Sequence, residues 1–299
     1  MRALVTGAAG FVGRHLVGHL ESMGDTVVGV DRHDGPDLLD APALEAFVAD
    51  VAPDAIYHLA GWSDVGGSWR EPQAAFAANA VGTLNLLQAC RSVTARVLSV
   101  SSADVYGRVS LSELPLSEEA PLRPVTPYAV SKVAADYLGV QATLGYGLDV
   151  IRVRAFNHLG PGQTNRFVAP AIAERIARNE FDGSEVVTVG NLTPRRDFTD
   201  VRDVVRAYRL LVTHGETGEA YNVCSGVDIA ISDLADQLVT MAARPMRLQE
   251  DPSLQRPVEV PVLRGDPTKL HKATGWQPEI ALSQTLSDLL DEWRARVGP

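Results

Sequence analysis

The chain has 299 residues, of which 45% are hydrophobic and 21% charged, with a formal net charge of −10. This composition is typical of a folded globular protein with one large α/β domain, or one domain and a smaller lobe. The negative charge argues against nucleic acid as a partner, because a phosphate backbone requires a basic surface, and no apolar run reaches the roughly 18–20 residues of a membrane helix.

The sequence also lacks a targeting signal and the cysteine spacings that are typical of disulfides or zinc sites. The N-terminus begins with the strand-like RALVTG and shows no signal-peptide pattern, so we expect a cytoplasmic protein. Cys90 and Cys224 have neither disulfide nor zinc spacing, and we therefore expect no metal site.

The first half of the chain alternates apolar, β-branched runs with helical patterns. Such runs are typical of strands that are buried on both faces of a parallel sheet. We predict strands at 2–7, 26–31, 55–61, 95–102 and 148–156. We predict helices at 11–24, 41–51, 71–92 and 126–145. Strand–helix alternation with short connections predicts a doubly wound parallel sheet of the α/β class, with a Rossmann fold.

After about residue 157 the pattern changes. The segments 157–163 (NHLGPGQ) and 191–200 (NLTPRRDFTD) are rich in Gly, Pro or Asn and predict loops. Further helices are expected near 168–180, 201–213, 231–243 and 282–296, and short strands near 186–189 and 220–224. We interpret residues 1–156, with some later segments, as the NAD(P)-binding domain. Residues 157–299 would mainly form a substrate-binding lobe over the carboxyl edge of the sheet.

A glycine-rich run, TGAAGFVG, follows the first predicted strand and opens the first helix. Gly7, Gly10 and Gly13 would let the backbone turn tightly and approach a dinucleotide pyrophosphate, which the helix N-terminus then stabilises. Asp31 ends the second strand 18 residues after Gly13, where an acid accepts hydrogen bonds from the adenosine ribose. The cofactor is therefore expected to be NAD(H) or NADP(H).

The residues after the second strand leave the choice between NAD and NADP open. Asp31 favours NAD, because a 2′-phosphate would lie against its charge, but Arg32 and His33 could pair with that phosphate. Asp37 and Leu38 could contact the adenine or could cap the following helix.

The segment TPYAVSK contains Tyr128 and Lys132, which are four residues apart and would share one face of a helix. A lysine cation beside a phenol is expected to lower the phenol's pKa, as a group that exchanges protons with a carbonyl or carbinol oxygen requires. The spacing also occurs by chance on surface helices. It gains meaning here from the dinucleotide motif and the serine-bearing strand upstream.

Together, these segments resemble the extended short-chain dehydrogenase/reductase family, whose members oxidise, reduce, epimerise or dehydrate nucleotide sugars. The resemblance extends from residue 2 to about residue 280. It rests on TGAAGFVG, HLAG (58–61), Asn79 in NAVGTLNLL, SSADVYG (101–107), YAVSK and RDFTDVRD.

The resemblance implies roles for individual residues. Ser102 would hydrogen-bond the reacting oxygen, Tyr128 would be the acid/base, Lys132 would hold Tyr128 and the ribose, and Asn79 would order the site behind them. The further cofactor contacts that it implies are Phe11, Val12, Leu59, Ala60, Gly61, Ser101 and Phe156.

Later segments are similar to the subgroup that acts on GDP-sugars, the GDP-mannose 4,6-dehydratases and GDP-4-keto-6-deoxymannose reductases. These segments are RAFNHLGPGQ, RRDFTDVRD, YNVCSG and RPVEVPVLRGDPTKL. This similarity implies that Asn157 and Arg196 bind the substrate diphosphate and that Arg256 and Glu259 hold the nucleoside. The alternative for Arg196 and Arg256 is a surface ion pair. Ser63 and Val168 are the remaining expected substrate contacts.

Asp104 bears on which reaction the chain performs. In the resembling family, dehydratases carry Glu at this position as the base that acts on sugar carbon 5, whereas the 4-keto-6-deoxymannose reductases carry Asp. Because Asp is one methylene shorter, we interpret Asp104 as an acceptor for a substrate hydroxyl or an organiser of the site, and dehydratase base as the minority interpretation.

The expected reaction is therefore reduction of the 4-keto group of a GDP- or other nucleotide-linked 4-keto-6-deoxyhexose by NAD(P)H. A nucleotide-sugar 4-epimerase with tightly held NAD is the main alternative, because residues 65–72 (VGGSWREP) resemble epimerases. A 4,6-dehydratase and a non-catalytic dinucleotide sensor are further alternatives. In this family the apolar helices around 74–90 and 129–140 form a four-helix bundle, which implies a homodimer.

Overall fold

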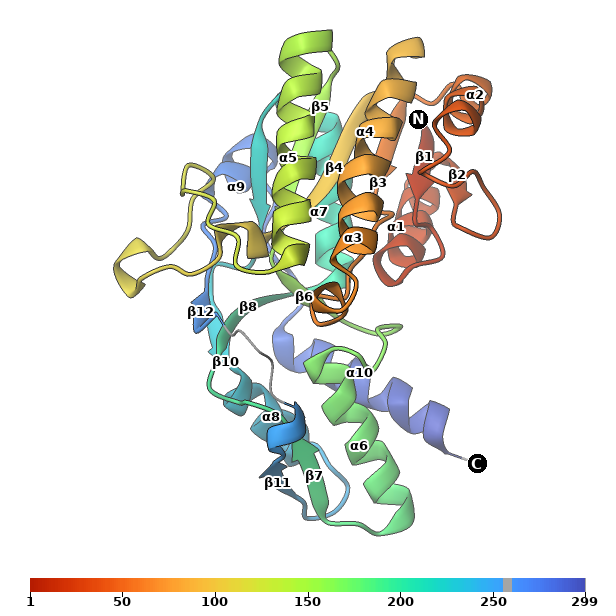
Figure 1. Cartoon of the computed structure of the whole chain (residues 1–299). Helices are drawn as coiled ribbons and strands as arrows, with labels where there is room; N and C mark the ends of the chain where they lie inside the picture. Colours follow the sequence, from red (N-terminus) through yellow and green to blue (C-terminus); the bar gives the residue numbers. More distant parts are fainter. Residues whose placement is uncertain (255–259, 299) are drawn as a thin grey trace.

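The computed structural model describes residues 1–254 and 260–298. Its larger part is a six-stranded sheet in the order β2-β1-β3-β4-β5-β9 (Figure 1). Every pairing in this sheet is parallel, and the predicted doubly wound α/β fold is confirmed. The strands are β1 (Arg2–Thr6), β2 (Thr26–Val30), β3 (Ala55–His58), β4 (Arg96–Ser102), β5 (Val150–Ala155) and β9 (Ala220–Val223).

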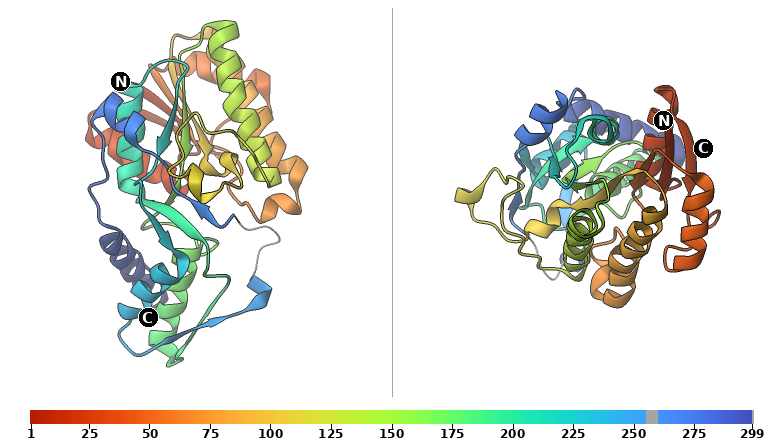
Figure 2. Two further views of the ribbon diagram at one scale, coloured as in Figure 1. Left: turned by 90° about the vertical axis from the view of Figure 1, so that its left-hand side faces the viewer. Right: turned by 90° about the horizontal axis from the view of Figure 1, so that it is seen from above.

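Helices cover both faces of this sheet, as the turned view in Figure 2 shows. One face carries α1 (Phe11–Ser22), α7 (Val201–His214) and α9 (Thr268–Thr274). The other face carries α2 (Ala41–Val51), α3 (Pro72–Phe76), α4 (Gly82–Ala89) and α5 (Pro127–Tyr146). Two apolar clusters result, one on each side of the strands, and this two-sided burial explains why the strands appear in the sequence as continuous apolar runs.

The single helix predicted at 71–92 is interrupted in the structure. Between α3 and α4 the chain forms one turn of π-helix, η2 (Ala77–Val81). The segment ends in the 3₁₀ turn η3 (Cys90–Ser92). A π-turn adds a residue to one turn of a helix and often marks a functional position. Asn79, at the centre of η2, is 2% exposed.

A second layer lies at the carboxyl edge of the large sheet and forms the lower half of Figure 1. Its strands are β6 (Asn157–Leu159), β7 (Val186–Val189), β8 (Arg195–Asp200), β10 (Asp228–Ala230), β11 (Arg247–Glu250) and β12 (Val262–Leu263). Its helices are α6 (Val168–Asp182), α8 (Ile231–Thr240) and α10 (Leu282–Val297). A core of its own, which includes Ile172, Leu234 and Leu289, holds this layer together. No helix among the described residues is long and apolar enough to cross a membrane.

Two segments that the sequence predicts as loops contain strands. β6 follows β5 directly and pairs in parallel with β8, and β8 pairs with both β10 and β12. These strands are short and largely polar, so they lack the hydrophobic periodicity by which a strand is recognised. Their partners come from distant parts of the chain, and only the folded structure supplies them.

Helix α5 has strong local start and stop signals. The Thr126 side chain accepts a hydrogen bond from the backbone N–H of Ala129, Pro127 occupies the first turn, and Gly147 ends the helix with φ of 70°. These signals fix the register in which Tyr128 and Lys132 face the sheet.

A buried ion network fastens α5 to β5. The Asp136 carboxylate of α5 is fully buried and lies 2.6 Å from Nη1 of Arg152 and 3.0 Å from Nε of Arg154. Arg154 also donates to the Tyr106 hydroxyl at 3.2 Å, and that hydroxyl donates to Oδ1 of Asn222. The network joins α5, β5, β9 and the turn that follows β4.

We expect Asp136→Ala to lower the free energy of unfolding by about 3–5 kcal/mol, because it leaves two arginines partly buried without their counter-charge. The matched control is Asp50→Ala on the exposed face of α2, which should change stability by less than about 0.5 kcal/mol. Urea unfolding followed by circular dichroism measures both. Equal stabilities of the two variants would contradict a structural role for the network.

Candidate functional site

The glycine-rich loop between β1 and α1 has no room for side chains. Gly7 has a φ of 75°, and a Cβ on it would lie 2.8 Å from the backbone nitrogen of Ala60. A Cβ on Gly13 would lie 2.1 Å from the carbonyl oxygen of Gly7. Gly10 is the N-cap of α1 and has no side chain that could accept a hydrogen bond. The N–H groups of the first turn, which includes Phe11 and Val12, therefore face the loop without a side-chain cap. This is the arrangement that a pyrophosphate requires.

The neighbouring strand ends complete this cradle. The backbone N–H of Leu59 donates to the Thr6 carbonyl, which brings β3 against the end of β1. A Cβ on Gly61 would lie 2.5 Å from Oδ1 of Asn79. The chain after β3 therefore passes close to the loop, and the residues present fit a dinucleotide.

Asp31 lies at the end of β2, where the sequence predicts the ribose ligand. Its carboxylate accepts hydrogen bonds from the backbone N–H groups of Ala9 at 3.2 Å and Arg32 at 2.7 Å. It therefore joins the end of β2 to the glycine loop. Arg32 and Asp37 are exposed.

The sequence left open whether Asp37 and Leu38 cap the next helix. The cap of α2 is Asp40, whose side chain accepts a hydrogen bond from Ala43, so the capping alternative is wrong. The Leu38 carbonyl accepts a hydrogen bond from Nδ2 of Asn85. Contact of these two residues with an adenine stays a prediction.

Ser102, Tyr128 and Lys132 meet at the carboxyl end of β4. Ser102 is the last residue of β4 and the N-cap of the 3₁₀ turn η4 (Ala103–Tyr106), and its hydroxyl accepts the backbone N–H of Asp104 at 3.1 Å. The Tyr128 hydroxyl is hydrogen-bonded to the Ser102 side chain. The structure thus brings the Ser102 hydroxyl and the Tyr128 phenol together at the end of β4.

The electrostatics at Tyr128 differ from the sequence-based expectation. Burial raises the pKa of the Tyr128 phenol above its ordinary value, and the negative charge of Asp104 raises it further. The hydrogen bond from Ser102 acts in the opposite direction and is outweighed. The expected lowering of this pKa by Lys132 is wrong for the protein by itself, and Tyr128 holds its proton through the neutral pH range.

Lys132 is itself strongly affected by burial. Its Nζ donates to the Val100 carbonyl at 2.9 Å, and burial lowers its pKa to about 8. The Ser101 hydroxyl donates to the Lys132 carbonyl at 3.2 Å, so Ser101 ties β4 to α5. The ammonium lies near Gly61, where a Cβ would be 3.9 Å from Nζ, and a buried ammonium at this position can bind the hydroxyls of a ribose.

Asn79 orders the site through its amide. Its Oδ1 accepts the backbone N–H of Trp62 at 2.8 Å, and its Nδ2 donates to the Ser131 hydroxyl at 2.8 Å. Ser68, which the sequence analysis did not single out, accepts the backbone N–H of Tyr128. Ser68 lies in the epimerase-like stretch 65–72, and this is the signal that could have identified it.

The predicted substrate-binding residues are more dispersed. Ser63 and Asn157 are exposed, and Val168 begins α6 half-buried. Arg196 lies on β8, where its guanidinium donates to the Arg195 carbonyl.

Three further predicted positions remain, the cofactor contact Phe156 and the substrate contacts Arg256 and Glu259. Phe156 is 2% exposed and packs beside Tyr106 in an apolar cluster, so any cofactor contact there is made by its backbone or ring edge. Arg256 and Glu259 lie outside the described residues.

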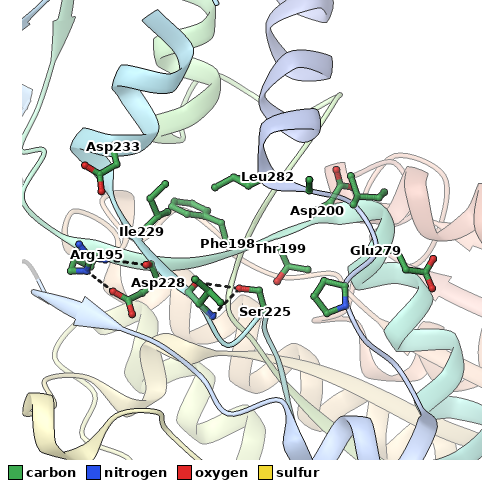
Figure 3. Close-up of a pocket in the computed structure, with 14 residues that line it drawn as sticks. Arg195, Phe198, Thr199, Asp200, Ser225, Asp228, Ile229, Asp233, Glu279 and Leu282 are labelled. Carbon is green, nitrogen blue, oxygen red and sulfur yellow. Dashed lines mark hydrogen bonds and ion pairs between the residues drawn. The ribbon is translucent and has the colours of Figure 1, made fainter. Parts of the chain in front are cut away.

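A cavity of about 540 Å³ lies elsewhere in the structure and is not this site. It lies beside β8 and β10 and is closed by the segment that leads into α10 (Figure 3). Arg195 and Asp228 form an ion pair at its edge, and none of the predicted catalytic or cofactor-binding residues lines it.

Comparisons with known proteins agree with this geometry. The profile of a family described as GDP-mannose 4,6 dehydratase matches residues 33–289. The chain is 40% identical to GDP-6-deoxy-D-mannose reductase from Pseudomonas aeruginosa, over 99% of this chain and 98% of that protein. The solved structure of RMD from Pseudomonas aeruginosa complexed with NADPH matches with a TM-score of 0.92 and 40% identity, covering 99% of each chain.

Epimerases also match over nearly the whole chain. UDP-glucose 4-epimerase from Mycolicibacterium smegmatis is 30% identical over 98% of this chain and 99% of that protein. The structure of UDP-glucose 4-epimerase from Thermus thermophilus in complex with NAD has a TM-score of 0.86 at 30% identity, covering 98% of this chain and 99% of that one.

We expect Gly13→Ala to weaken NADPH binding at least tenfold, because the added methyl group collides with the loop carbonyl that it faces. Gly18→Ala on the same helix is the control, since a Cβ there meets nothing within 4 Å. Titration of intrinsic fluorescence with NADPH measures both affinities. Equal affinities would show that the loop is not the pyrophosphate site.

Proposed function

We propose that this chain, which belongs to the GDP-mannose 4,6-dehydratase branch of the extended short-chain dehydrogenase/reductase family, is an NAD(P)H-dependent reductase of a nucleotide-linked 4-keto-6-deoxyhexose. Members of the family use NAD or NADP and act on nucleotide sugars, as reductases, dehydratases and epimerases. A GDP-linked sugar is the favoured substrate, because the 40% identical relative is a GDP-6-deoxy-D-mannose reductase.

The 40% identity to a GDP-6-deoxy-D-mannose reductase, over 99% of this chain, supports the reductive interpretation most directly. At the site, the buried Tyr128 phenol lies beside Ser102, the hydroxyl expected to bind the reacting oxygen, and burial raises the pKa of this phenol. A group that must give a proton to a forming alkoxide is needed in its protonated state.

Each residue of the site has its own role in the proposed reaction. Bound NAD(P)H supplies the hydride that reaches carbon 4 of the sugar. Ser102 hydrogen-bonds the carbonyl oxygen and holds it against Tyr128, and Tyr128 donates its proton to that oxygen. Lys132, whose ammonium is buried beside β4, is proposed to bind the ribose hydroxyls.

The substrate's nucleoside diphosphate is proposed to lie over the second layer. Arg196 on β8 is expected to pair with the diphosphate, with Asn157 beside it, because a guanidinium binds such oxygens in a forked geometry. Ser63 and Val168 would flank the sugar. Arg256 and Glu259 are proposed to hold the base.

An epimerase is the second candidate, and the 30% identical UDP-glucose 4-epimerases favour it. The two functions differ in how they treat the cofactor. An epimerase regenerates the cofactor in each turnover and can retain it, whereas a reductase must release it. Near-stoichiometric NAD in the denatured, purified protein would therefore support the epimerase and contradict the reductase.

We also propose a homodimer that forms through α3, α4 and α5. Phe76, Val81 and Tyr137 are between 38% and 59% exposed on these helices, and they line an apolar hollow of about 370 Å³. A second copy of the same face would bury them in a four-helix bundle. We further propose a cytoplasmic location, which fits the two buried free cysteines.

We expect Tyr128→Phe to reduce NADPH oxidation in the presence of GDP-4-keto-6-deoxymannose by about 10²–10⁴-fold, because it removes the proton donor. NADPH affinity, measured by fluorescence, should stay within about threefold of the wild-type value. The loss of absorbance at 340 nm measures turnover. Absence of turnover by the wild type with any nucleotide-linked 4-keto sugar would overturn the proposed function.

The dimer is tested by Val81→Asp, which places a charge at the centre of the apolar face. We expect this variant to be monomeric at micromolar concentration, because a buried unpaired carboxylate is strongly unfavourable. Leu111→Asp is the control, since Leu111 is 76% exposed on a turn away from this face. Light scattering coupled to size exclusion gives the masses, and a monomeric wild type would contradict the dimer.

A further inference from the structure

The first turn of α5 is completed by a side chain from a distant segment. Pro127 has no N–H to satisfy, and the Thr126 hydroxyl accepts the N–H of Ala129 at 3.0 Å. Tyr128 is the second residue of the helix, and a residue in this position has no helical carbonyl four residues back to accept its N–H. This N–H donates instead to the Ser68 hydroxyl at 3.2 Å, from a residue 60 positions earlier in the chain.

The Ser68 hydroxyl has a fixed orientation. Ser68 is completely buried, and its hydroxyl donates its proton to the Val65 carbonyl at 2.7 Å. With the proton engaged there, the lone pairs of the oxygen remain to accept the N–H of Tyr128. Ser68 therefore forms a defined link between the 3₁₀ turn η1 (Gly67–Trp69) and the first turn of α5.

The segment that carries Ser68 is itself held by side chains. Oδ1 of Asn79 accepts the N–H of Trp62 at 2.8 Å, and Nδ2 of Asn79 donates to the Trp62 carbonyl at 3.2 Å. The ring N–H of Trp62 donates to the Asp64 carbonyl at 2.6 Å, and the Asp64 carboxylate accepts the N–H of Gly67 at 2.8 Å. Ser68 therefore follows directly on a turn whose backbone is closed by hydrogen bonds.

The carbonyl of Tyr128 is also bound by a serine. The Ser131 hydroxyl donates to this carbonyl at 2.6 Å and accepts Nδ2 of Asn79 at 2.8 Å. Ser131 and Asn79 are 0% and 2% exposed. Both polar backbone groups of Tyr128 are thus bonded to buried serine hydroxyls, and Ser131 leads back through Asn79 to the segment that carries Ser68.

We propose that Ser68 is a positioning residue that fixes the backbone of Tyr128 and thereby places its phenol for proton transfer to the substrate oxygen. The inference rests on the proposed reductase function, in which Tyr128 is the proton donor. A tyrosine side chain has few rotatable bonds, so a displacement of its backbone is carried to the phenol oxygen. Misplacement of a reacting group by about 1 Å can cost on the order of a hundredfold in rate.

The test is Ser68→Ala in the full chain, which leaves the N–H of Tyr128 buried without its acceptor. We expect the kcat for reduction of GDP-4-keto-6-deoxymannose by NADPH to fall at least about tenfold. The KM for the sugar and the Kd for NADPH should stay within about twofold of the wild-type values, because the Ser68 hydroxyl is bonded to backbone groups of the protein. A lower kcat at constant KM separates lost positioning from lost binding.

A second measurement needs no substrate. Hydrogen exchange of the Tyr128 amide, resolved to the single residue, should be about tenfold faster in Ser68→Ala, because the hydrogen bond that protects this amide is lost. Exchange of the Ala129 amide, which Thr126 protects, should change by less than about threefold. Faster exchange at Tyr128 in a protein that turns over no keto-sugar would support the link and contradict the proposed function, so the two failures are distinguishable.

Ser92→Ala is the matched control. The Ser92 hydroxyl donates to the Ala89 carbonyl at 2.8 Å, three residues back, as the Ser68 hydroxyl donates to the Val65 carbonyl. Ser92→Ala therefore removes the same local hydrogen bond from another 3₁₀ turn, η3, and should leave both kcat and the exchange at Tyr128 unchanged. Ser68→Cys keeps a weak acceptor at the site and should recover part of the lost kcat.

Other outcomes would overturn the inference. A wild-type kcat in folded Ser68→Ala would show that the phenol does not depend on this link. A raised KM for the sugar at constant kcat would make Ser68 part of the substrate site instead. Where Ser68→Ala does not fold, as judged by circular dichroism, Ser68→Cys decides: faster exchange at Tyr128 without any loss of kcat would reject the positioning role.

Discussion

The buried carboxylate of Asp136 is the constraint on which the arrangement of the site depends. It neutralises Arg152 and Arg154 on β5, and Arg154 in turn holds Tyr106 in the turn after β4. A charge in this position is tolerated only when its partners are fixed. The helix that carries the phenol and lysine, and the turn that carries the serine and aspartate, are therefore held in one register.

Burial has a second consequence at the site itself. It lowers the pKa of Lys132 and raises that of Tyr128, so both shifts favour the neutral forms. A phenol that keeps its proton suits an enzyme that protonates an alkoxide. Relatives over nearly the whole chain perform epimerisation and dehydration, so the fold alone does not select the reaction.

The two layers have separate tasks. The glycine loop, the strand ends and α5 form the cofactor half, and their residues are close in sequence to recognisable motifs. The second layer offers Arg196 on a strand whose partners come from residues 157–159, 228–230 and 262–263. The cavity of about 540 Å³ beside these strands is lined by none of the predicted catalytic residues.

The sequence by itself determined the parallel sheet, the glycine-rich loop and the placement of Tyr128 and Lys132 on one helix, because each depends on local periodicity or short spacing. It did not determine the strands β6 and β8, whose stability comes from distant partners, or the π-turn that presents Asn79. The direction of the Tyr128 pKa shift was also decided only by the tertiary structure. Burial and the approach of Asp104 from another element outweigh the lysine four residues away, and neither can be read from spacing along one helix.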